Sequence, residues 1–328
     1  MSVTTTAVSV LGAVAPVTRR VRAYFAPVNR AAGVPVLFDA AQMGAFALET
    51  PPTPWVDLGW CEKFVRKCGT KVGAVRTGAP AVVQTQVRTE VESTVALEFG
   101  AWGKLQAALA SGSQQMNLLA VAVGAAANGS GGVAAAPVAL AAGSTATVLN
   151  VGTTAAAGFN VGDLVAVDVD YAGQVGFVGS GVSGAYVKQA SDVGSDVNYV
   201  RRVSLNVGRV VGNSAGVLTL GAALLAGVPV TGMQVSRLVG FVDREGGSFF
   251  QEWSAVFVMD GEQGDRVIFH YPRLQALQGS SEGAEVLAGP LERVRLAGAW
   301  RALPVKDAVD GETVVCFRSY LPGAMRAV

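Results

Sequence analysis

The chain has 328 residues, of which 51% are hydrophobic, 15% are charged and only 7% are aromatic, and it contains 41 glycines. Its 25 basic and 24 acidic residues nearly cancel, which excludes a nucleic-acid binder that neutralises phosphates, because such a protein needs a basic excess. A single histidine, His270, removes most histidine-based catalysis. We therefore expect a protein that is not an enzyme and that needs no cofactor or metal.

Composition predicts an N-terminal arm over residues 1–19, a core domain over residues 20–125 and 240–328, and an inserted domain over residues 126–239. The inserted part is rich in small residues and poor in charge. The end before residue 126 carries 11 basic and 7 acidic side chains, whereas the end after residue 238 carries 9 and 12. These opposite excesses predict that the two ends meet, within one chain or between copies. Polar and glycine residues interrupt every apolar stretch before ~20 residues, so no membrane insertion is expected.

Alternation of residue types over residues 83–99 predicts either one long strand or two strands that meet at a bend. Apolar and small side chains from Val83 to Phe99 occupy one face. The opposite face is polar and includes Arg88, Glu90, Glu92 and Glu98. A strand of this length spans about 55 Å if unbroken, well beyond the usual five or six residues. A short helix follows over residues 101–110 and ends at a Ser-Gly-Ser turn.

The middle of the chain predicts short strands at residues 145–151, 162–169, 199–211 and 217–225, separated by glycine-rich turns. Regular short strands of this kind indicate a small β-barrel or sandwich.

Several motifs in the middle are discounted. Gly179–Gly184 spells a dinucleotide-binding fingerprint but lacks the helix that must follow it. Gly212–Gly216 spells a nucleophile elbow but leads into a strand, so we interpret it as a β-turn. Asp163, Asp168 and Asp170 are too few for a calcium site and are interpreted as a solvated strand face.

The last ninety residues predict a β-hairpin between residues 249 and 271, followed by strands at 291–303 and 312–321. Trp253 and Phe257 share the apolar face of this hairpin, and we expect both in the main core.

These elements resemble those of the major tail (tail tube) proteins of tailed bacteriophages. The resemblance covers residues 20–125 and 240–328. It rests on the Trp/Pro-rich loop Pro51–Trp60, the long strand pair, the short helix and the closing hairpin. It implies a mainly β fold, with a β-sandwich or barrel and one flanking short helix. The segment 126–239 departs from the family pattern and is expected to be an inserted small β-barrel or sandwich on the outside.

The resemblance also implies a structural virion protein that self-assembles into stacked, hexameric rings and conducts DNA into the host during ejection. Its partners would be other copies of itself, the tail terminator, tape measure and baseplate proteins, and passing DNA. It would assemble in the host bacterial cytoplasm and reside in the virion tail. The face with Arg88, Glu90, Glu92 and Glu98 would line the lumen. The alternatives are another β-rich virion part (terminator, baseplate or decoration protein) and a carbohydrate-binding adhesion module.

Overall fold

The computed structural model describes residues 18–120, 122, 135–168, 174–177, 184–187, 195–244, 251–261, 264–277, 281–288 and 291–322. The fold is mainly β, with antiparallel strands and a few short helices, as the alternating patterns predict. The chain forms two compact units. The first comprises the described residues up to Phe25, Leu37–Trp102 and those from Trp253 onward, and the second comprises Ala26–Val36 and Gly103–Glu252.

These boundaries differ from the expected ones at residues 126 and 239. The second unit already includes the helix α2 (Lys104–Ser111) and the strand β4 (Gln114–Leu119). It includes them because β4 pairs with β12 (Gln234–Arg244), which places Leu119 opposite Leu238. The change in composition comes near residue 126, after β4 has already paired with β12. Composition therefore does not reveal the boundary between the units. The predicted arm over residues 1–19 lies, apart from its last two residues, outside the described residues.

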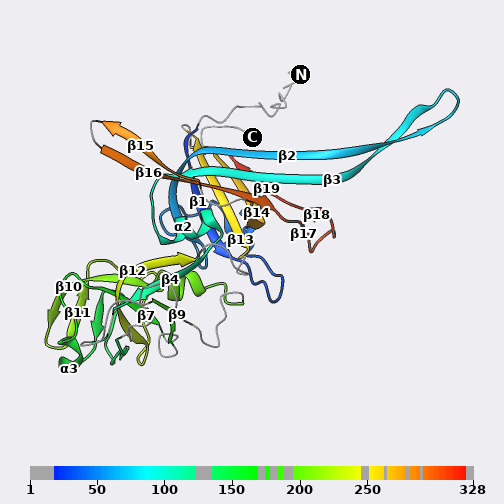
Figure 1. The fold of residues 1–328 in the computed structure, drawn as a ribbon. Coiled ribbons are helices and arrows are strands. Elements are labelled where there is room, and N and C mark those ends of the chain that lie inside the picture. Colours follow the sequence, from blue (N-terminus) through cyan, green and yellow to red (C-terminus); the bar gives the residue numbers. More distant parts are fainter. Residues whose placement is uncertain are drawn as a thin grey trace, which may run out of the picture. The chain divides into compact units, whose positions relative to one another are not determined.

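The first unit is built on a sheet that closes on itself (Figure 1). Its strands follow the order β16-β3-β2-β1-β13-β14, and β14 pairs back to β16. These strands are β1 (Thr18–Pro27), β2 (Val56–Thr77), β3 (Val82–Phe99), β13 (Trp253–Gly261), β14 (Arg266–Ala276) and β16 (Leu291–Ala302).

Smaller elements complete the first unit. The strand β15 (Ser281–Ala288) pairs with β16, and β19 (Phe317–Leu321) pairs with β14. The strands β17 (Val305–Lys306) and β18 (Thr313–Val314) form a separate two-stranded ribbon, and α1 (Ala40–Met43) is a single helical turn.

Aromatic side chains fill the interior of the closed sheet. The ring of Phe25 lies 5.8 Å from that of Phe257, 6.4 Å from Trp253 and 5.5 Å from Trp300. Phe257 is 0% exposed and Trp253 is 5% exposed, so both lie in this core. The hairpin that presents them is β13–β14, in which Phe257 pairs with Phe269. The few aromatic residues of the chain are thus concentrated where their large buried area stabilises the fold most.

The second unit contains a sheet in the order β6-β11-β10-β7-β12-β4-β9-β8, with β5 also pairing with β12. Its further strands are β5 (Val138–Ala139), β6 (Val148–Asn150), β7 (Leu164–Asp168), β8 (Gln174–Phe177), β9 (Gly184–Val187), β10 (Val207–Ser214) and β11 (Val217–Leu220). The helix α3 (Thr153–Ala156) packs near β11. Mainly leucine and valine form the core, with Leu149, Val165 and Leu218 fully buried.

Two expectations for the second unit are wrong. The predicted strand 199–211 begins instead with a π-helical turn, η2 (Val200–Ser204), and only then continues as β10. Asp168 is not on a solvated face, because it is fully buried and forms an ion pair with Arg202, which also contacts Asp196 at 2.8 Å. A buried carboxylate requires such a partner, and the turn supplies it.

Of the motifs discounted above, Gly212–Gly216 lies wholly within the described residues. Ala215 and Gly216 have φ of 51° and 87° and connect β10 to β11 as a two-residue turn. Positive φ at both positions is the geometry that tight hairpins favour, so the β-turn interpretation of Gly212–Gly216 is confirmed. Of Gly179–Gly184, only Gly184 lies within the described residues.

A buried lysine begins the helix α2. The ammonium of Lys104 donates a hydrogen bond to Oδ1 of Asn117 at 2.6 Å, and both residues are buried. Burial lowers the pKa of Lys104 from 10.5 to about 7, because the charged form is poorly solvated there. The helix ends at Gly112, whose φ of 66° lies in the left-handed region that glycine tolerates.

We expect Lys104 to make the second unit more stable at high pH. Because its pKa is lowered on folding, the unfolded chain binds more protons between pH 7 and 10.5, and stability rises with pH across that window. The gain between pH 7 and 9.5 should be about 3 kcal/mol. Lys104→Met should abolish this gain.

Urea unfolding monitored by circular dichroism measures this gain. Tryptophan fluorescence is unsuitable, because all five tryptophans belong to the first unit and do not report on the second. Equal pH dependence in the parent chain and in Lys104→Met would contradict the prediction.

Candidate functional site

The strands β2 and β3 continue as a long hairpin beyond the rest of the first unit (Figure 1). Thr77 pairs with Val82 at its tip. At its base, Nε of Arg66 donates to the hydroxyl of Tyr271 at 2.9 Å, which ties β2 to β14. The part from Lys67 to Glu92, here called the distal hairpin, is exposed apart from the half-buried Gly73. It is roughly 35–40 Å long at 3.3 Å per residue.

The faces of β3 follow the predicted alternation only near the core. Ser93, Val95, Leu97 and Phe99 are buried and define the inner face, which is the face that continues the interior of the closed sheet. The predicted apolar face does not stay buried beyond Ser93, since Val83, Val87 and Val91 are 47%, 52% and 42% exposed.

Two register shifts also exchange residues between the faces of the distal hairpin. Glu90 pairs with Lys71 and Arg88 pairs with Val72, so Thr89 is an extra residue on β3, and a second shift leaves Gln84 extra. Paired residues share a face and neighbours in a strand alternate, so Arg88 and Glu90 lie on opposite faces. The expectation that Arg88 shares one polar face with Glu90, Glu92 and Glu98 is therefore wrong.

The bulges leave valines on both faces of the distal hairpin. Val72, Val83 and Val91 lie on the inner face, whereas Val75 and Val87 lie on the outer face, and all five are exposed. An isolated two-stranded hairpin is marginally stable in water, and exposed apolar surface of this kind marks an interaction site. The distal hairpin is therefore a candidate interaction site.

Each carboxylate on the outer face of β3 has a basic partner. Glu90 contacts Lys71 at 2.6 Å and Glu92 contacts Arg301 at 3.0 Å. The hydrogen bond with Glu90 raises the pKa of Lys71. Glu98 accepts from Lys63 at 2.7 Å and also forms an ion pair with Arg295. The outer face is therefore a mixed lattice of charges and not the acidic surface that β3 alone predicts.

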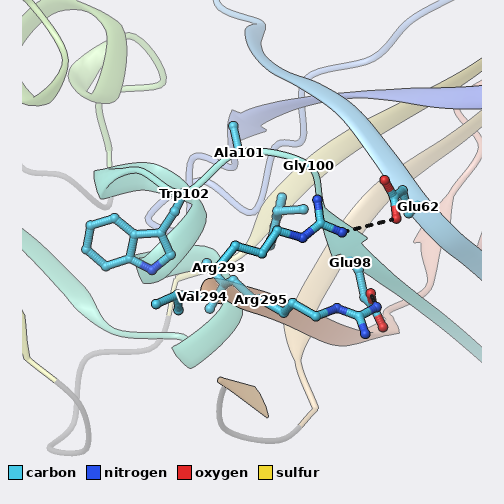
Figure 2. A pocket seen from close by; sticks show the side chains of 10 residues that line it. Glu62, Glu98, Gly100, Ala101, Trp102, Arg293, Val294 and Arg295 are labelled. Carbon is cyan, nitrogen blue, oxygen red and sulfur yellow. Dashed lines mark hydrogen bonds and ion pairs between the residues drawn. The ribbon is translucent and has the colours of Figure 1, made fainter. Parts of the chain in front are cut away.

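Arginines of β16 neutralise two of these glutamates. Arg293 and Arg295 of the same strand line a small pocket (Figure 2). Arg293 points toward Glu62, 4.0 Å away, and Arg295 points toward Glu98. The pocket offers about 30 Å³. That space holds about two or three water molecules, which is too little for a substrate. Beside it, Trp102 is 53% exposed, and an exposed tryptophan next to arginine is typical of protein contact sites.

The sequence did not predict the ion pairs between β16 and β3 or the exposed position of Trp102. The row Arg293, Arg295 and Arg301 alternates with apolar residues in the sequence, which indicates a strand edge or an interface. Only the pairing of β16 with β3 brings these arginines to Glu92 and Glu98. The exposed tryptophan carries no sequence signal, since most tryptophans here are buried.

Among the described residues, no group of three or more His, Cys, Asp and Glu side chains is arranged to hold a metal ion. No helix in the described part of the chain combines the length and apolar character needed to cross a membrane. A scan against protein-family models and a search of curated proteins found no match to this chain.

Proposed function

We propose that this protein is the tail tube subunit of a tailed bacteriophage, a structural protein that assembles into stacked, hexameric rings and forms the conduit for DNA during ejection. The distal hairpin carries this proposal. It extends a closed, aromatic-filled sheet into a ribbon that exposes valines on both faces. A second copy of the chain is the occupant that would cover the inner face.

The geometry of the hairpin supports assembly by a head-to-tail contact. In the contact that we propose, the hairpin of one subunit lies on a different surface of the next, so the interface is not self-complementary. Interfaces of this kind close into rings or continue as open stacks. The strands β15 and β19 add to this argument, because each pairs with only one described strand and so offers a free edge for a neighbouring sheet.

We further propose that the outer face of β3, with Glu90, Glu92 and Glu98, lines the conduit. Its lattice of paired charges is close to neutral, so it neither binds the DNA phosphates strongly nor repels them. Passing DNA then meets a hydrated surface on which it slides.

Replacing Glu90 and Glu92 by lysine should alter folding little, because exposed ion pairs contribute at most about 1 kcal/mol. In assembled particles the added positive charge, repeated around each ring, should hold DNA and slow its release. Release of DNA from tubes of this variant, timed against the parent, is the measurement. Normal release from normal tubes would remove this face from the conduit.

Electron microscopy of the purified full-length protein tests the proposed function. Tubes of stacked rings with an open lumen are the expected result. Single rings would favour a terminator, and monomers at every concentration would contradict the proposal. Monomers that bind glycans would favour the adhesion module.

A further inference from the structure

A rigid acidic loop joins β17 to β18. It spans residues 307–312, and we call it the acidic loop. The amide of Val309 donates to Oδ1 of Asp307 at 2.8 Å, and that of Glu312 donates to Oδ1 of Asp310 at 2.9 Å. The backbone of Asp307 and Glu312 is joined by a further bond of 2.8 Å. These bonds fix the loop before any partner arrives, which lowers the entropy cost of binding.

The acidic loop presents charge and apolar surface together. Val309 is 96% exposed and lies between Asp307 and Asp310 in the sequence. None of the three carboxylates of the loop forms an ion pair within the part of the chain that the structure describes. With the neighbouring Lys306, the ribbon carries a net charge of −2.

The inner face of the distal hairpin has the complementary character. It carries Arg76 and Arg88 together with Val72, Val83 and Val91. Both glutamates of the distal hairpin alternate with Ser93 and Val91 onto the outer face, and the register shift at Thr89 places Arg88 on the inner face. Neither arginine has an ion pair with a described residue. The inner face therefore presents two available positive charges among exposed valines.

We propose that the inner face of the distal hairpin of one copy docks on the acidic loop of a second copy. This inference rests on the proposed function and names the two surfaces of its head-to-tail contact. Arg76 and Arg88 meet the carboxylates, and Val309 packs among the valines. Guanidinium–carboxylate contacts that lose water on docking set the register and the choice of partner.

Charge reversal and rescue test the contact in the full-length chain. The hairpin variant is Arg76→Glu with Arg88→Glu. The loop variant is Glu312→Arg with Asp310→Asn, in which the asparagine keeps an acceptor for the capping bond. Each variant alone should raise the critical concentration for assembly at least tenfold, as measured by sedimentation. The two combined should return it to within about threefold of the parent.

The matched control is Arg30→Glu with Arg209→Glu, two exposed arginines of the second unit. This pair should not rescue the loop variant. Circular dichroism establishes that each variant is folded. Tubes that form equally well from every variant, or a combined variant that is not rescued, overturn this inference and leave the proposed function standing. A parent chain that never assembles overturns the proposed function as well.

Discussion

A chain whose distal hairpin is shortened should fold normally and fail to assemble. We propose to replace Lys71–Glu90 by Asn-Gly, so that the paired residues Thr70 and Val91 flank a two-residue turn. The deleted residues are exposed apart from the half-buried Gly73, so the free energy of unfolding of the monomer should change by less than about 1 kcal/mol. Sedimentation and electron microscopy should find monomers only.

A milder variant tests the contribution of the valines to assembly while the hairpin keeps its full length. Val72→Ser, Val83→Ser and Val91→Ser together should also weaken assembly strongly. The control replaces three exposed valines of the second unit, Val228, Val230 and Val239, by serine, and should assemble like the parent. Normal tubes from the shortened chain would show that the hairpin has no part in assembly.

Phe257→Ala should destabilise the first unit by about 3–5 kcal/mol, the usual cost of removing a buried phenylalanine. The ring lies 5.0 Å from Phe64, 5.8 Å from Phe25 and 6.0 Å from Tyr271, so its loss opens a cavity that these neighbours do not fill. Urea unfolding followed by tryptophan fluorescence measures the effect, because every tryptophan belongs to the first unit.

Phe257→Leu is the conservative control and should cost clearly less, since most of the apolar volume remains. Trp253→Ala should resemble Phe257→Ala. A change below about 1 kcal/mol in both alanine variants would contradict the aromatic core.

Local patterns predicted the main strands of the first unit and the short helix of the second well. The alternation over residues 83–99 became β3, the hairpin around residue 260 became β13 and β14, and the short helix became α2 with its start three residues later. Side chains in a strand alternate whatever lies across from them, so this signal is contained in the sequence. The burial of Trp253 and Phe257 follows from the same alternation.

What the sequence determined by itself is therefore the β character, the position of its main strands and the apolar identity of the hairpin β13–β14. Only the tertiary structure decided where the inner face of β3 leaves the core, at Ser93, and that a bulge turns Arg88 away from Glu90. It also decided that the arginines of β16 neutralise the glutamates of β3. These features depend on contacts between segments as far as 209 residues apart. A register shift of one residue reverses a face without leaving a local signal.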